Sequence, residues 1–435
     1  MENIKTIQNL LGSESLEDVQ QGLKVWKEHF TSDLNTFIKS TLVLGGEKDI
    51  SYLVEPTNLE ELASYKQNHS GYIATPSSPY HQHISLWIAH QYEIFEEGRM
   101  TTLALGHEES SLYEAMWQEI PEQIAQFKGL QNLYMETGAI TVIPEWIGDL
   151  QSLVDLNLHW NGIKELPQSF SKLKHMTDLN LGKNSFEEIP SVLQYFTDLK
   201  DLDFSDNEIT VIPDWIGNLD KLKKLNFYLT QISEVPASIG KLNNLEELYL
   251  NSTNLSAIPE SFKNLKKLKR LYLGNIGISK LPECICELES LEELHIQGNK
   301  LSSLPSSIGN LKNLKHLNLK ENSLTSIPES IGNLKNLKHL DLGNNYLESL
   351  PESIGNLESL EVLSLYYNHL QTLPESIGQL GKLRWLNLNC LNDENPVILP
   401  KTIVLLNSLE SLSVYGNEDA ITPDIREQLK NCTIR

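Results

Sequence analysis

Three aspartates, Asp155, Asp178 and Asp201, stand 23 residues apart, and Asp203 and Asp206 follow the last of them closely. Carboxylates repeated in register on one surface repel one another, so they need water, counterions or a basic partner beside them. Such a column is either a solvated acidic face or a docking site for a cationic surface. We predict that it forms part of a partner-binding face.

Aromatic side chains recur at positions related to these aspartates and form two groups. Tyr and Trp are frequent at binding hot spots because they bury a large area with few torsions and carry a polar tip. Aromatics so placed can also simply pack on one another. We predict that both groups bind a partner: Tyr228, Tyr249 and Tyr272, with Leu229, in the centre, and Tyr366, Tyr367, Trp385 and Tyr415 near the C-terminal end.

Two further clusters have side chains that could hold a metal. His81, His83 and His90 lie close together, and Cys284 and Cys286 flank a single residue. A structural zinc site needs four ligands, and neither cluster has a second ligand pair nearby in sequence. We interpret the histidines as polar residues of a terminal region and the cysteines as reduced thiols, and we assign no metal-binding residue.

Motifs of common catalytic sites are absent from the sequence. It contains no GxxxxGK[ST] phosphate loop, no GxGxxG turn, no HExxH and no GxSxG. We therefore predict that the protein is not an enzyme, and we assign no catalytic residue, no cofactor-binding residue and no cofactor.

A repeated element positions all of these side chains. Proline recurs every 23 residues over most of the chain, and a fixed period of this length is typical of a solenoid, in which each unit buries its apolar face against its neighbours. The prolines are Pro121, Pro144, Pro167, Pro190, Pro213, Pro236, Pro259, Pro282, Pro305, Pro328, Pro351 and Pro374, then Pro400 and Pro423 after a longer interval.

The repeat that begins at Leu337 shows what each position should do. The LxxLxL spacing of Leu337, Leu340 and Leu342 predicts a short strand with its leucines in the core. Asn345 should be buried, with its amide bonded to backbone groups of its own or an adjacent turn. Ile354 should point inward from the opposite wall. Stacked repeats of this kind predict one parallel sheet.

The form LxxLxLxxNxLxxLPxxIGxLxx resembles the 23-residue class of leucine-rich repeats found in Ras-group intracellular proteins and in many bacterial ones. The resemblance covers about 300 residues. It implies an α/β fold, a curved right-handed horseshoe with a concave parallel sheet that binds proteins or peptides. It does not imply one particular ligand.

Departures from this form interrupt the predicted asparagine ladder. Gly138, Thr230, Thr253 and Ile276 stand where other repeats have asparagine. Threonine can make part of the amide's hydrogen bonds, whereas isoleucine can make none. Either water and backbone compensate for the change, or the solenoid is locally softer or differently curved there.

We predict two domains. Residues 1–106 lack the repeat and form a mainly helical N-terminal cap region, and residues 107–435 form the solenoid. Within the solenoid, 107–129 is a degenerate entry repeat, about thirteen repeats follow from 130, and 423–435 caps the C-terminal end with a short helix. Residues 392–396 form a polar excursion in a longer repeat.

Charge and targeting signals restrict the class of partner. The formal net charge is −23, which disfavours nucleic acid and anionic membrane and favours a neutral or basic partner. We find no secretory signal and no membrane span, and we expect a cytoplasmic protein. The leading hypothesis is a non-enzymatic scaffold that binds a protein or extended peptide. The alternatives are a glycan or small-molecule receptor that uses the aromatics, or a metal or enzyme domain at the N-terminus that the solenoid targets.

Overall fold

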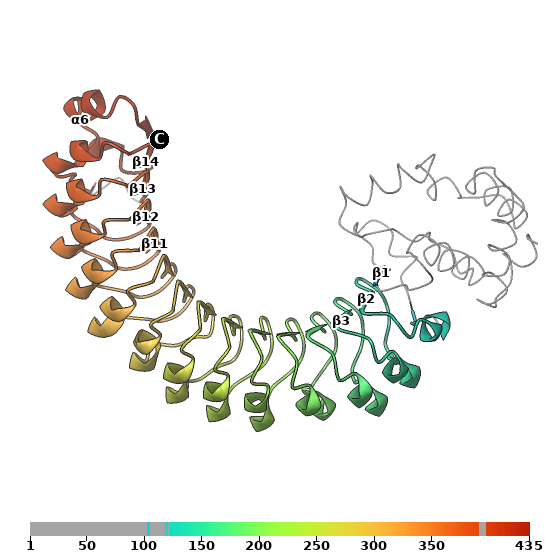
Figure 1. The fold of residues 1–435 in the computed structure, drawn as a ribbon. Coiled ribbons are helices and arrows are strands. Elements are labelled where there is room, and N and C mark those ends of the chain that lie inside the picture. The colour runs from blue at the N-terminus through green and yellow to red at the C-terminus, as the bar shows by residue number, and fades with distance from the viewer. Residues whose placement is uncertain (1–101, 105–117, 121, 391–396) are drawn as a thin grey trace, which may run out of the picture. The chain divides into compact units, whose positions relative to one another are not determined.

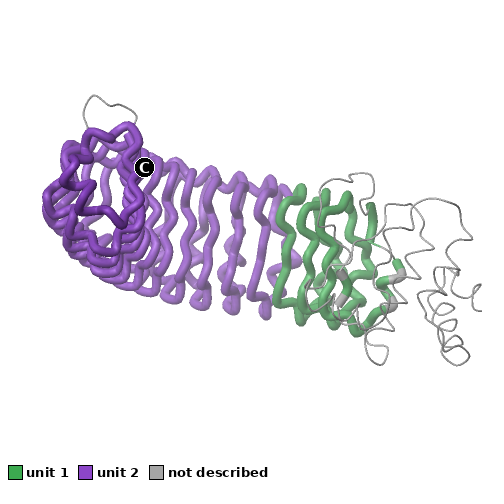
Figure 2. Tube along the Cα trace, turned by 90° about the horizontal axis from the view of Figure 1, so that it is seen from above, with its two compact units in different colours: residues 1–185 green, residues 186–435 purple. Residues whose placement is uncertain are grey.

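The computed structural model describes residues 102–104, 118–120, 122–390 and 397–435. These residues belong to two compact units, one ending at Ser185 and the other comprising Phe186–Arg435 (Figure 2). Both units are built from the same 23-residue repeat, so each is described below on its own.

Each repeat contributes one short strand, and strands of successive repeats pair in parallel, with partners 23 residues apart from β2 to β4 in unit 1 and from β5 to β13 in unit 2. The strand is short because the alternating LxL segment is only three residues long. Unit 1 holds β1 (Thr102–Ala104), β2 (Asn132–Tyr134), β3 (Asp155–Asn157) and β4 (Asp178–Asn180). Unit 2 holds β5 (Asp201–Asp203), β6 (Lys224–Asn226), β7 (Glu247–Tyr249), β8 (Arg270–Tyr272), β9 (Glu293–His295), β10 (His316–Asn318), β11 (His339–Asp341), β12 (Val362–Ser364), β13 (Trp385–Asn387), β14 (Ser411–Ser413) and β15 (Thr433–Ile434).

The opposite wall is made of short 3-10 helices, and from η5 to η16 each of them follows the repeated proline. In unit 2 the strands follow the concave side of an arc and the 3-10 helices its convex side (Figure 1). Proline suits this position because its fixed φ precedes the turn and its missing N–H is not needed. The turns are η4 (Glu122–Gln126), η5 (Glu145–Asp149), η6 (Gln168–Lys172), η7 (Ser191–Tyr195), η8 (Asp214–Asn218), η9 (Ala237–Lys241), η10 (Glu260–Asn264), η11 (Glu283–Glu287), η12 (Ser306–Asn310), η13 (Glu329–Asn333), η14 (Glu352–Asn356), η15 (Glu375–Gln379), η16 (Lys401–Leu405) and η17 (Glu418–Ala420).

The core lies between the strands and the 3-10 turns. Leu340 and Leu342 from the strand side and Ile354 from the outer wall are all buried, as the sequence predicts. Glycine after this isoleucine lets the outer turns approach closely: a Cβ on Gly355 would overlap the carbonyl oxygen of Ser376 in the next turn. The outer wall is therefore packed backbone to backbone.

The asparagine ladder is present and confirms the prediction for Asn345. Its Oδ1 accepts from the N–H of Leu324 at 3.0 Å, and its Nδ2 donates to the carbonyl oxygens of Leu319 and Leu342 at 3.0 and 3.1 Å. Each amide thus satisfies buried backbone groups of two repeats. The same pattern holds at Asn161 and Asn184 in unit 1, and at Asn299, Asn322 and Asn368 in unit 2.

The interruption of the ladder has the predicted chemistry. The buried hydroxyl of Thr230 donates to the carbonyl of Phe227 at 2.8 Å, and that of Thr253 donates to the carbonyl of Leu250 at 2.7 Å. One hydrogen bond therefore replaces the several that each asparagine makes. Ile276 is buried and offers only an aliphatic side chain.

The C-terminal end carries the expected short helix, α6 (Pro423–Gln428), whose N-cap hydroxyl, that of Thr422, accepts from the N–H of Ile425 at 3.3 Å. Beyond it, β15 pairs with β14. At the other end, β1 pairs in parallel with β2, so the sheet already includes residues 102–104. The rest of the predicted cap region, its histidines and the polar excursion at 392–396 lie outside the described residues, and the boundary at 106 stays a prediction.

Candidate functional site

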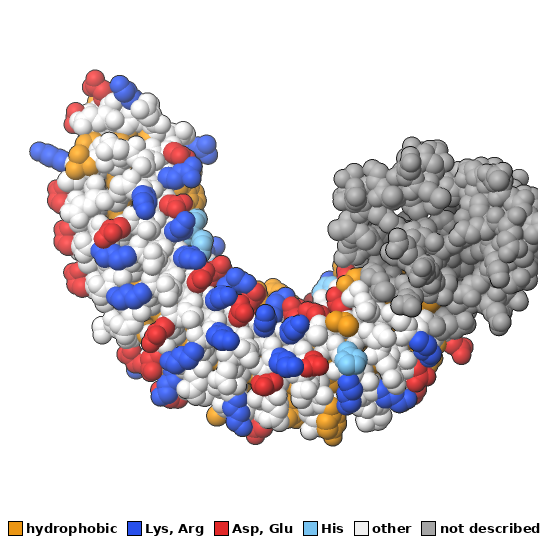
Figure 3. Space-filling model, in the orientation of Figure 1, with side chains coloured by type: hydrophobic (Ala, Val, Ile, Leu, Met, Phe, Trp, Pro, Cys, Tyr) orange, Lys and Arg blue, Asp and Glu red, His pale blue; other side chains and the backbone are white. Residues whose placement is uncertain are grey.

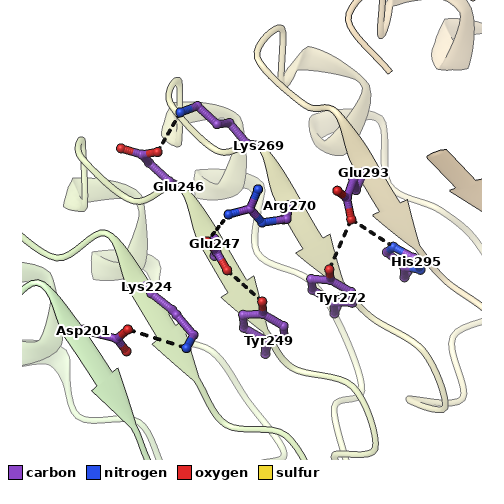
Figure 4. A network of polar contacts seen from close by, with 10 residues as sticks. All are labelled: Asp201, Lys224, Glu246, Glu247, Tyr249, Lys269, Arg270, Tyr272, Glu293 and His295. Atoms are coloured by element: carbon purple, nitrogen blue, oxygen red, sulfur yellow. Dashed lines mark hydrogen bonds and ion pairs between the residues drawn. The ribbon is translucent and has the colours of Figure 1, made fainter. Parts of the chain in front are cut away.

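A row of alternating charges crosses the concave side of unit 2. Successive strands place Asp201, Lys224, Glu247, Arg270 and Glu293 side by side in register. The carboxylate of Asp201 lies 3.5 Å from the ammonium of Lys224, and the guanidinium of Arg270 forms an ion pair with Glu247 (Figure 4). We call these five residues the charge row. Opposite charges in register attract where like charges would repel.

A stack of three rings lies beside the charge row, two residues further along each strand. The rings of Tyr249 and Tyr272 are 4.4 Å apart and inclined by 6°, and His295 continues the stack at 4.5 Å and 9°. We call these three side chains the ring stack. Since the strands hold the rings at the spacing between repeats, the stack is preorganised by the sheet.

Hydrogen bonds tie the ring stack to the charge row. The hydroxyl of Tyr249 donates to Glu247 at 2.7 Å, and that of Tyr272 donates to Glu293 at 3.2 Å. Burial, and then the hydrogen bond to Glu247, raises the pKa of Tyr249, and burial and Glu293 raise the pKa of Tyr272. Both phenols therefore stay protonated at neutral pH, and each ring is held at its tip as well as at its faces.

An exposed apolar pair flanks the ring stack. Tyr228 and Leu229 follow strand β6 and are 41% and 46% exposed. The N–H of Tyr228 donates to the side chain of Asn226 at 2.9 Å, which fixes the turn. Leu229 has φ +57°, a left-handed conformation that recurs at the same turn position of other repeats, such as Asp206 and Ser252, and that is strained for a bulky side chain.

The aspartates of the predicted acidic column differ from one another in their surroundings. In unit 1, Asp155 and Asp178 lie opposite each other in register, and burial raises the pKa of Asp155, helped by Asp178 and opposed by a hydrogen bond from Tyr134. Lys183 lies over the ring of Trp160, with its nitrogen 3.3 Å from the centroid.

In unit 2 the remaining aspartates have local partners. Asp201 belongs to the charge row. Asp203 accepts from the N–H and hydroxyl of Ser205 and from the amide of Asn226. Asp206 occupies the left-handed turn position, with φ +53°. On the face of unit 2 seen in Figure 3, acidic and basic side chains are interspersed. The acidic excess of the sequence therefore does not gather into one uniform patch on this face.

The second aromatic group is looser than the ring stack. The rings of Tyr366 and Tyr367 meet edge to face at 5.2 Å, and Tyr366 covers Gly343 of the preceding repeat. Trp385 and Tyr415 are 41% and 71% exposed. These four predicted residues thus present aromatic surface near the C-terminal end, where the hydroxyl of Tyr366 is hydrogen-bonded to Lys320.

Sequence reasoning missed most of the charge row and His295. The signal that could have found them is the same period of 23 residues: continuing the aspartate column past Asp201 gives Lys224, Glu247, Arg270 and Glu293. The cysteines predicted to be reduced are free thiols. Cys284 and Cys286 are buried, and burial raises the pKa of each to about 11, so both remain protonated at neutral pH.

Comparison with known proteins identifies the family. A model described as leucine-rich repeat region matches residues 213–296, 263–344 and 328–433, and a second, described as leucine rich repeat, matches residues 198–219. Together with the repeat geometry, these matches show that the chain belongs to the leucine-rich repeat family. Domains of this family are in general protein-binding scaffolds and typically have no enzymatic activity.

Solved structures of leucine-rich repeat proteins resemble this chain. A Leptospira interrogans leucine-rich repeat protein, LIC12759, is 29% identical, with a TM-score of 0.72 over 86% of this chain and 98% of that one. The chain in the PEPR1–AtPEP1 crystal structure is 28% identical, with a TM-score of 0.56 over 73% of this chain and 50% of that one. The plant peptide hormone receptor RGFR1, solved in complex with RGF2, is 25% identical, with a TM-score of 0.51 over 73% of this chain and 69% of that one.

No curated protein matches this chain. Within the described residues, no helix has both the length and the apolar character that crossing a bilayer requires.

Proposed function

We propose that this protein is a non-enzymatic scaffold that binds another protein or an extended peptide on the concave side of unit 2, around the ring stack. The observation that carries the proposal is the ring stack itself. Tyr249, Tyr272 and His295 are partly exposed, mutually stacked and hydrogen-bonded to the charge row. Rigid aromatic side chains of this kind lose little conformational freedom when a partner covers them.

The surroundings of the stack suit a protein partner. Tyr228 and Leu229 add exposed apolar area on one side, and the charge row adds polar groups on the other. An aromatic centre with a polar rim is the usual composition of a protein-binding surface. RGFR1, which is similar to this chain in fold, is a peptide hormone receptor solved with RGF2, and this resemblance supports a peptide as the partner.

A glycan receptor is less well supported by the same geometry. A sugar stacks on an open aromatic face, whereas both faces of Tyr272 are covered by Tyr249 and His295. The further candidate residues Asp155, Asp178, Asp201, Asp203 and Asp206, and the aromatic group at Tyr366, Tyr367, Trp385 and Tyr415, remain part of the proposed partner-binding surface. Localisation in the cytoplasm, a preference for basic partners and a capping role for residues 1–106 also remain proposals.

The test is selection of linear peptides from a random display library on the intact chain. Enriched peptides are synthesised, and their affinities are measured for the wild type, for Tyr249→Ala and for Tyr272→Ala. Loss of a hot-spot aromatic costs about 2 kcal/mol or more, which corresponds to a roughly 30-fold weaker Kd. We expect this loss for both variants.

A matched control separates binding from folding. Tyr195→Ala removes an exposed tyrosine from the outer wall of the same unit and should leave affinity unchanged. Melting temperatures of all three variants should stay within a few degrees of the wild type. If no peptide is enriched, or if the concave variants bind as well as Tyr195→Ala does, the proposed function is wrong.

A further inference from the structure

Four of the five residues of the charge row form two ion pairs, and Glu293 is the member outside these pairs. Asp201 pairs with Lys224, and Glu247 pairs with Arg270, which stands next to Glu293 in register but directs its guanidinium to Glu247 (Figure 4). The row therefore runs acid, base, acid, base, acid and ends on a carboxylate. On the far side of Glu293 the next strand offers His316 rather than a lysine or arginine.

Glu293 forms no ion pair with a lysine or arginine of the described residues, although it feels the charge of Arg270, whose guanidinium pairs with Glu247. Oε2 of Glu293 accepts from the hydroxyl of Tyr272 at 3.2 Å and lies 3.4 Å from Nε2 of His295. Tyrosine is uncharged here, and histidine is charged only when it is protonated. The side chain of Glu293 is 29% exposed, so a partner can reach it.

Nearby lysines are already engaged elsewhere. On the neighbouring row of side chains, Lys269 lies 2.7 Å from Glu246 and Lys315 lies 2.6 Å from Glu292. Both lysines therefore form ion pairs in the neighbouring row, one residue before the charge row on each strand. A half-buried carboxylate that has no direct ion pair with a lysine or arginine is a favourable place for a cation supplied by a partner.

We propose that an arginine side chain of the bound peptide completes the charge row at Glu293, beside the rings of Tyr272 and His295. The inference rests on the proposed function and names the chemistry of the partner. Arginine fits because its planar fork matches a carboxylate with two parallel hydrogen bonds, and because a guanidinium is weakly hydrated and packs well against aromatic rings. The partner residue would continue the alternation of charge by one more position.

Side chains from three strands surround the proposed arginine position. Arg270 and Tyr272 lie on β8, His295 lies on β9 with Glu293, and His316 lies on β10.

The experiment uses the display-selected peptides and the intact chain. Each arginine of an enriched peptide is replaced by citrulline, which keeps the shape and removes the charge. We expect one arginine whose replacement weakens binding to the wild type at least tenfold. Glu293→Gln should weaken binding of the arginine peptide similarly. On Glu293→Gln, citrulline should cost nothing further, since the two changes remove one interaction.

Glu289→Gln is the control, because it removes the same charge at an exposed position outside the strand. It should bind like the wild type. The inference is overturned if the enriched peptides lack a conserved arginine, or if citrulline costs as much on Glu293→Gln as on the wild type. The proposed function survives both of those results. It fails, and the inference with it, only if no peptide is enriched or if the ring-stack variants bind normally.

Discussion

Two stretches of unit 2 hold their repeats together differently. From Asn299 to Asn368 each repeat has a ladder asparagine that bonds backbone groups of two repeats. Between Thr230 and Ile276 the column differs: each threonine makes one hydrogen bond through its hydroxyl, and the side chain of Ile276 can make none. In the second stretch the repeats are connected at the concave surface instead, by the ion pairs of the charge row and by the ring stack.

A cluster of aromatic rings lies in the core just before the second stretch. Phe204 and Phe227 stack with ring centroids 6.4 Å apart, and Phe186 meets Phe204 edge to face at 5.4 Å. Within the second stretch, surface ion pairs and stacked rings replace the amide ladder where the candidate site lies. The comparison indicates that a departure from the repeat consensus in the core can mark the repeats whose surface forms a binding site.

The largest difference between the two stretches should appear when a ladder residue is removed. Asn345→Ala leaves the N–H of Leu324 and the carbonyls of Leu319 and Leu342 without partners, and should lower the free energy of unfolding by about 1–3 kcal/mol. Urea denaturation of the variant and the wild type measures this change in the free energy of unfolding. The control is Asn344→Gly, because Asn344 has φ +54° and alanine there would add strain of its own. Equal stabilities of the two variants would refute the ladder.

Removing a threonine from the interrupted stretch should cost less. Thr253→Ala breaks one hydrogen bond of 2.7 Å to the carbonyl of Leu250, so we expect a loss of about 1 kcal/mol. The same denaturation experiment gives the value. A cost as large as that of Asn345→Ala would mean that the two stretches are equally dependent on this column, and the comparison would fail.

Relief of backbone strain should separate stability from binding. Leu229→Gly removes a bulky side chain from a left-handed position, and after the entropy cost of glycine the protein should gain about 0.5 kcal/mol. Thermal unfolding tests the gain, and peptide affinity should fall because apolar area is lost beside the ring stack. A variant that is less stable would show that Leu229 is held by packing rather than strained.

The smallest expected effect is a pH dependence in the regular stretch. His316 and His339 stack at 4.5 Å, and burial, followed by the charge of His316, lowers the pKa of His339. In the unfolded chain this histidine should titrate near its ordinary pKa of about 6.5. The unfolded state then binds more protons as pH falls through this value, so stability should decrease below it. His339→Gln should flatten this dependence between pH 7.5 and 5.5, and an unchanged slope would contradict it.

Much of the fold follows from spacing, because a solenoid repeats one local solution. Leu340, Asn345 and Ile354 could be placed from one repeat, and the reduced bonding of Thr253 follows from its hydroxyl. The site is only partly predictable. That Tyr249 and Tyr272 lie together follows from the 23-residue interval, but the choice of Arg270 between Glu247 and Glu293 depends on side-chain rotamers. The left-handed turn at Leu229 recurs at the same position of successive repeats, but the identity of the residues that occupy this turn varies from one repeat to the next.

The register of the charge row has a consequence for how such a chain can change by recombination. Removing 23 residues leaves every core position filled, because each repeat occupies the same columns. It does not leave the charges unchanged: loss of the repeat that holds Glu247 would bring Lys224 against Arg270, two like charges in register. Loss of two repeats, those of Glu247 and Arg270, would set Lys224 beside Glu293 and restore the alternation. In this part of the chain, loss or gain of a single repeat preserves the core. Only loss or gain of two repeats together also preserves the alternation of charge on the surface.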